Sequence, residues 1–201
     1  RRKMVRYVIE NDVMPPWHAA GGGPWLNDRS LGERDRGLLL AWIEAGTPEG
    51  DPTHAPVARE RSVDWQAGEP DAIVENSRSY EIPARGTIDY QYSYVQTDFG
   101  EDKWVRGFQI KPSAGEVVHH VLVFVEEPRL PEESERDWRR RDQGGLHGYF
   151  AAYVPGQGPT FFGDGLAKKL PADAWLKIQI HYTTNGTATT DTTSIGFYFA
   201  D

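Results

Sequence analysis

Hydrophobic and polar residues alternate through the last two thirds of the chain. In residues 88–96 (IDYQYSYVQ), every second residue as far as Tyr94 is aliphatic or aromatic. In residues 176–184 (LKIQIHYTT), the aliphatic positions 176, 178 and 180 are predicted to point inward, and Lys177, Gln179 and His181 to the opposite face. Several short runs of this kind, separated by Gly and Pro turns, favour an antiparallel arrangement without alternating helices. We therefore predict a mainly β fold, an antiparallel jelly-roll-like β-sandwich, over residues 71–201.

The first fifty residues have a helical period instead. A short amphipathic helix is expected around residues 4–9, ended by the prolines that begin at Pro15. A second helix is expected from Ser30 to Gly46, with Ser30 as N-cap and Glu33 completing a capping box. Its apolar face comprises Leu38, Leu39, Trp42 and Ile43. The predicted organisation is a short helical segment at 1–52, a polar linker at 53–70 and the sandwich at 71–201.

Composition narrows the function. The net charge of −8 argues against a nucleic-acid partner, and no apolar run approaches the roughly 18 residues of a membrane span. The 201 residues include no cysteine, which excludes disulfides and thiolate metal sites. The chain has no initiator methionine, and we expect it to be a piece of a longer protein.

Two adjacent histidines interrupt the apolar run EVVHHVLVFV at residues 116–125. Neighbouring residues of a regular strand point to opposite faces, so His119 and His120 can share one ion only where the backbone twists or bulges. The alternative is that one imidazole is hydrogen-bonded in the core and the other faces solvent. His181, at the end of another alternating strand, favours the shared site, because three neutral imidazoles with an open position suit copper or zinc. His18, His54 and His147 lie in loop or linker sequence and are predicted to be surface residues.

The segments VVHHVLVFV, YVPG, LKIQIHYTTNG and DTTSIGFYFA resemble the N-terminal copper domain of the type II, ascorbate-dependent monooxygenases. This family includes peptidylglycine α-hydroxylating and dopamine β-monooxygenases. The resemblance implies that His119, His120 and His181 bind an electron-transfer copper. It further implies a second copper domain, beyond this chain, where O2 is activated and a C–H bond is hydroxylated. Ascorbate or a cytochrome would supply electrons, the location would be extracytoplasmic, and this chain alone would contain no catalytic residue.

A second resemblance concerns MPPWHA and NDRSLGERDRGLLLAWIEAGTPEGD, which are similar to the last part of a c-type cytochrome domain fused upstream of such copper domains in bacterial proteins. It implies that Met14 corresponds to the axial methionine of the haem. The CxxCH attachment motif is missing, so haem c is expected only in a longer protein.

The sequence also allows one alternative from a different functional class. The chain would then be a non-catalytic β-sandwich binding module, in which the histidines only pack or hold a structural zinc.

Overall fold

The computed structural model describes residues 1–15, 17, 23–25, 28–57, 64–126, 132–140 and 148–200, with the backbone alone for 138–140. The chain divides into two compact units, residues 1–60 and 61–201, which are described separately. No helix within these described ranges has the length and apolar character needed to cross a membrane.

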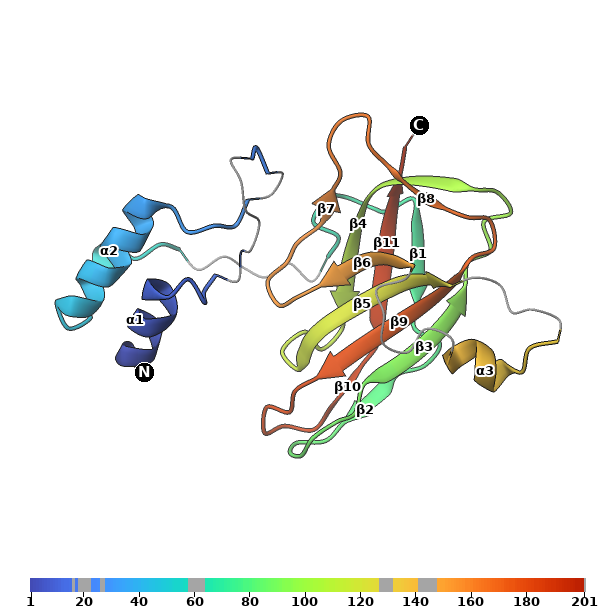
Figure 1. Ribbon diagram of the computed structural model, residues 1–201. Helices are drawn as coiled ribbons and strands as arrows, with labels where there is room; N and C mark the ends of the chain where they lie inside the picture. The colour runs from blue at the N-terminus through green and yellow to red at the C-terminus, as the bar shows by residue number, and fades with distance from the viewer. Residues whose placement is uncertain are drawn as a thin grey trace. The chain divides into compact units, whose positions relative to one another are not determined.

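The first unit is helical (Figure 1). It contains α1 (Arg2–Glu10), α2 (Glu33–Glu44) and the 3-10 turn η1 (Pro52–His54). Polar contacts join the two helices: the Arg36 guanidinium donates to the Glu10 carbonyl at 3.0 Å and pairs with the carboxylate of Asp12. Both predicted helices are therefore present, and the second ends where expected, with Gly46 in the left-handed region at φ 89°.

The predicted capping box is wrong. α2 begins at Glu33, with Gly32 as N-cap and no side-chain cap. The Ser30 N–H instead donates to the Asp28 carboxylate at 2.7 Å. This local side-chain turn is a known competitor of helix formation, and it keeps Ser30 outside the helix.

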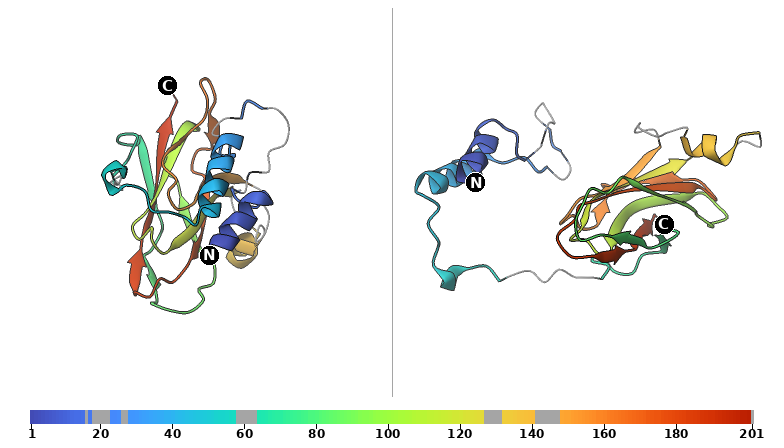
Figure 2. Two further views of the ribbon diagram at one scale, coloured as in Figure 1. Left: turned by 90° about the vertical axis from the view of Figure 1, so that its left-hand side faces the viewer. Right: turned by 90° about the horizontal axis from the view of Figure 1, so that it is seen from below.

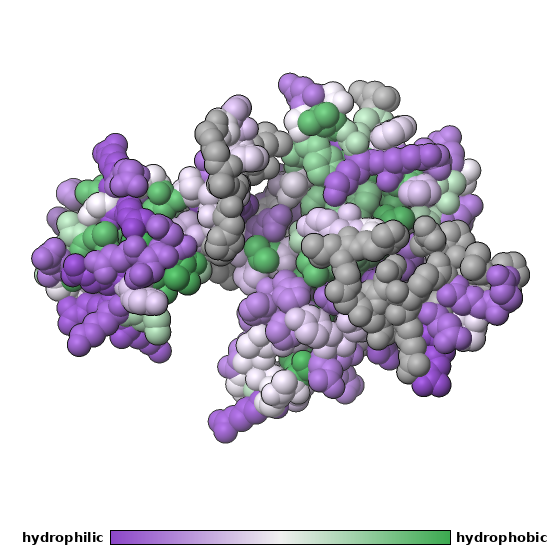
Figure 3. All heavy atoms as spheres, viewed as in Figure 1, coloured by the Kyte–Doolittle hydropathy of each residue, from purple (hydrophilic) through white to green (hydrophobic). Residues whose placement is uncertain are grey.

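The apolar face of α2 is mostly not covered. Ile43 is buried, but Leu38, Leu39 and Trp42 are 59%, 38% and 47% exposed. Hydrophobic side chains are correspondingly visible among polar ones at the surface of this unit (Figure 3). The helical period thus predicted both helices correctly.

The second unit is the antiparallel β-sandwich that the alternation predicts. Its one helix among the described residues is α3 (Glu135–Arg140). Its strands are β1 (Ala72–Glu75), β2 (Tyr80–Ile82), β3 (Gln91–Gln96), β4 (Lys103–Pro112), β5 (Val118–Glu126), β6 (Tyr149–Tyr153), β7 (Thr160–Phe161), β8 (Lys168–Leu170), β9 (Trp175–Tyr182), β10 (Thr189–Asp191) and β11 (Thr193–Phe199).

The strands form two main layers, seen edge-on in the right-hand view of Figure 2. One sheet has the order β1-β11-β4-β7, with β8 also paired to β4, and the other has the order β3-β9-β5-β6. A small β10-β2 ribbon adjoins them. Every paired strand is antiparallel, and the core between the layers consists of inward-facing aliphatic and aromatic residues such as Ile178, Val123, Ile195 and Phe197.

Strand β9 shows the predicted inward and outward faces, whereas on β3 it is Ser93 that is buried opposite Ile178, and Tyr92 and Tyr94 lie on the outer face. On β9, residues 176, 178 and 180 are fully buried against the other layer, and His181 and Gln179 are half-buried on the opposite face. Lys177 shares that outer face but is only 2% exposed, and its buried ammonium pairs with the carboxylate of Glu126 on β5. Alternation therefore assigned the face of Lys177 correctly, and a place on the outer face does not make this residue exposed.

Part of the predicted linker packs on the five-stranded sheet. The Trp65 ring lies 4.3 Å from the Lys111 ammonium, and the Gln66 N–H donates to the Gln109 side chain at 2.9 Å. The segment passes over Gly196, where an added Cβ would lie 2.5 Å from Pro70 Cγ. The sandwich therefore includes a strap ahead of its first strand.

Candidate metal centre

A β-bulge brings the two adjacent histidines to one place. In the pairing of β5 with β9, Val118 is opposite Tyr182 and His120 is opposite His181. Two steps on β5 thus match one step on β9, and His119 is the extra residue. A bulge lets neighbouring side chains leave the strict alternation of a strand. This is the backbone irregularity that a shared site for the two histidines requires.

The three imidazoles converge at this bulge. Nδ1 of His119 and Nδ1 of His120 are 3.1 Å apart, so one ring donates a hydrogen bond to the other. The ring centroid of His181 lies 5.0 Å from that of His119 and 5.1 Å from that of His120. One potential ligand atom from each residue lies within 4.8 Å of the other two. The cluster could therefore hold a metal ion.

These separations fit a common ion after a small adjustment. Two nitrogens bound to one ion at about 2 Å are roughly 3.3 Å apart at the tetrahedral angle and at most about 4 Å apart. The 3.1 Å between the Nδ1 atoms of His119 and His120 already suits such a pair. Ligand nitrogens that lie up to 4.8 Å apart come within about 4 Å of each other after a side-chain movement of about 1 Å.

The surroundings favour the neutral form of His120, the form that binds metal. Burial lowers the pKa of His120, and the neighbouring rings of His181 and His119 lower it further. Nδ1 of His181 is buried and has no hydrogen-bond partner among the described residues. A buried polar atom without a partner costs free energy that a metal bond at this nitrogen would offset.

Tyr90, just before β3, forms one wall of the site. Its ring stacks on that of His181, with centroids 4.7 Å apart and planes inclined by 27°, and lies 5.7 Å from the ring of His120. The stacking follows from the sheet register, since Gln91 is paired with Ile180 and the preceding residue therefore lies beside His181. The alternation groups Tyr90 with Tyr92 and Tyr94 on one face, but neither the side of the sheet nor the place of Tyr90 at the site can be read from it, because both depend on the strand pairing.

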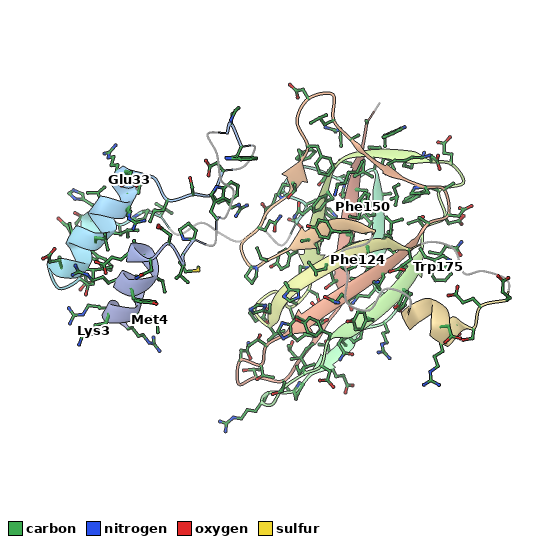
Figure 4. All side chains as sticks on the ribbon, in the orientation of Figure 1. Lys3, Met4, Glu33, Phe124, Phe150 and Trp175 are labelled. Atoms are coloured by element: carbon green, nitrogen blue, oxygen red, sulfur yellow. The ribbon has the colours of Figure 1, made fainter. Side chains whose placement is uncertain are left out.

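The same outer face carries a buried ion pair between Lys177 and Glu126, away from the histidines. Phe124 on β5 is opposite Lys177 on β9 in the strand register, with its ring centroid 4.8 Å from the ammonium. Figure 4 shows Phe124 together with Trp175, at the start of β9. Lys177 and Glu126 pair with each other here, on the same outer face as His181 and His120.

The remaining predicted residues lie elsewhere or outside the described part. Met14 belongs to the helical unit, where its side chain is 50% exposed. His54 is exposed in η1, as predicted for a surface histidine. His18 and His147 lie outside the described residues. Within the described residues, the one cluster of potential metal ligands is therefore His119, His120 and His181.

Comparison of the sequence with protein-family models and with curated proteins finds no match. The function is therefore inferred from the histidine cluster and the sandwich that positions it.

Proposed function

We propose that the sandwich is the copper-binding, electron-transfer domain of an oxidoreductase similar to the type II, ascorbate-dependent copper monooxygenases. The observation that carries the proposal is the convergence of His119, His120 and His181 at one bulge, with Nδ1 of His181 buried and unpartnered among the described residues. The two segments that supply these ligands, β5 and β9, are among those that carry the resemblance to that family.

The donor set supports copper. Imidazole is a good ligand for copper and zinc, whereas a structural zinc site usually has four protein ligands in a closed shell. The cluster offers three ligands, and His119 is exposed to solvent. Bound copper would supply one-electron redox chemistry at this site. The exposed side of His119 leaves the site accessible to a reductant, while the stacked Tyr90 ring covers His181.

In this proposal the longer protein contains the second copper domain, uses O2 to hydroxylate a C–H bond, receives electrons from ascorbate or a cytochrome, and is extracytoplasmic. The helical unit would be the end of a c-type cytochrome domain, with Met14 as haem ligand. The residues present do not form that haem site, because the chain contains no cysteine for the thioether bonds and Met14 is half exposed. No electron-transfer step is therefore assigned to Met14.

A copper titration against a competing chelator tests the proposal. The chain should bind one copper, and His181→Ala should weaken binding at least tenfold, about 1.4 kcal/mol, without loss of the fold. The fold should persist because His181 lies on the outer face of β9, away from the core. His54→Ala is the matched control, since His54 is an exposed histidine in η1. Equal copper affinity in His181→Ala and the parent would place the site elsewhere.

A further inference from the structure

A buried carboxylate lies next to the strand that carries His181. Asp191, the last residue of β10, is completely buried and accepts four hydrogen bonds. Oδ1 accepts from the Ala114 N–H at 2.8 Å and from the Ser113 hydroxyl at 3.3 Å. Oδ2 accepts from the Tyr182 phenol and the Thr193 hydroxyl, at 2.9 Å and 2.8 Å. Each of the four groups can donate, which matches the acceptor capacity of an ionised carboxylate.

Two of these donors belong to the two segments that carry the histidines. Tyr182 follows His181 directly on β9. Ala114 stands at the start of the turn from β4 into β5, and its carbonyl accepts from the Val117 N–H at 3.0 Å. The Val117 carbonyl in turn accepts from the Thr183 N–H at 2.8 Å. Asp191 therefore ties the start of β5 to the end of β9 from inside the sandwich.

The bulge lies immediately after this tie. Val118 is opposite Tyr182, and the extra residue, His119, comes next. The position of the bulge depends on how the turn before β5 is placed against β9. The Asp191 carboxylate holds both the turn and the end of β9. A shift of one residue would move a histidine to the opposite face of the sheet.

We propose that Asp191 is a positioning residue for the histidine cluster, acting through Tyr182, the Ser113 hydroxyl and the Ala114 N–H. The inference rests on the proposed function, because it assigns the role of the carboxylate at that same metal site. Loss of a group that hydrogen-bonds a metal ligand typically changes metal affinity by about 10–100-fold. Asp191 bonds none of the histidines itself and acts through Tyr182, so the low end of that range is expected. A residue with a general stabilising role would change the melting temperature alone.

The chain offers a matched pair of variants. Tyr182→Phe and Thr193→Val each remove one hydrogen bond to Asp191 Oδ2, at residues that are 2% and 0% exposed. Tyr182 adjoins a ligand, whereas Thr193 lies on β11 in the other sheet. Both variants should lower the melting temperature to a similar extent. Only Tyr182→Phe should weaken Cu(II) binding, by about tenfold, and alter the Cu(II) electron paramagnetic resonance spectrum.

The outcomes separate this inference from the proposed function. Parental copper affinity and spectrum in Tyr182→Phe would overturn it, and so would an equal loss of affinity in Thr193→Val. If the parent chain binds no copper, the proposed function fails, and the metal-free imidazole ¹⁵N resonances decide the inference. Resonances of the clustered histidines that move in Tyr182→Phe and stay in place in Thr193→Val support positioning by Asp191. Resonances that stay in place in both variants contradict it.

Discussion

Replacing Lys177 with methionine should destabilise the sandwich by about 3–5 kcal/mol, the usual cost of removing one partner of a buried ion pair. The side chains of Lys177 and Glu126 are 3% and 6% exposed, so neither charge has water to replace its partner. The Phe124 ring, 4.8 Å from the ammonium, adds to the apolar surroundings. In Lys177→Met the Glu126 carboxylate stays buried without this cation. For a domain of this size, about 3 °C per kcal/mol, the melting temperature should fall by roughly 9–15 °C.

Thermal unfolding followed by circular dichroism provides the assay, with two companion variants. Lys169→Met is the control: it removes one partner of the Lys169–Asp102 pair, whose side chains are 51% and 44% exposed, and should leave the melting temperature close to that of the parent. Adding Glu126→Leu to Lys177→Met should recover most of the loss, because the unpaired charge is then gone. A Lys177→Met melting temperature within about 2 °C of the parent would show that the buried pair does not stabilise the sandwich in this way. So would a double variant no more stable than the single one.

Three further outcomes are expected. Copper affinity, measured by competition titration, should fall as pH drops below about 6.5, where ordinary imidazoles take up protons. Because the pKa of His120 is lowered, that residue should remain neutral further into the acid range. A loss of copper affinity above pH 7 would contradict this prediction. Tyr90→Leu should speed the transfer of copper to a chelator, since the ring stacked on His181 is lost, and an unchanged stopped-flow rate would show that the ring does not cover the site. Gly196→Val should destabilise the sandwich by about 1–3 kcal/mol in chemical denaturation, because the added Cβ would lie 2.5 Å from Pro70 Cγ and 2.9 Å from Trp65 Cζ3. A variant as stable as the parent would mean that the strap moves aside freely.

Much of the fold could be predicted because burial imposes a period of two on strands. The runs around Ile178 and Val123 alternate or are apolar in the way that a two-layer core demands, and both became paired central strands. Lys177 shows where this reasoning ends. Period alone indicates which face a residue occupies, but its burial depends on Glu126, a residue 51 positions earlier whose proximity depends on strand pairing.

The sequence allowed the three histidines of the cluster to be predicted, but not the backbone geometry that brings them together. Adjacent histidines in an apolar run indicated a site only if the strand was irregular there, and nothing local to His119 reveals a bulge. The bulge depends on the register of β5 against β9, which involves the turn at Ala114 and the carboxylate of Asp191. The prediction of a capping box at Ser30 was wrong for a local reason, because the Ser30 N–H donates to the Asp28 side chain and not to that of Glu33.

The most direct test of the central claim is an anaerobic titration of the copper-loaded chain with ascorbate, followed by electron paramagnetic resonance. The chain, desalted after loading, should show one Cu(II) per molecule, and ascorbate should abolish that signal while the copper stays with the protein. Reoxidation should restore the same spectrum, as expected when His119, His120 and His181 hold the ion in both oxidation states. A chain that retains no copper, retains only zinc, or keeps its Cu(II) signal in the presence of ascorbate would contradict the assignment of an electron-transfer site.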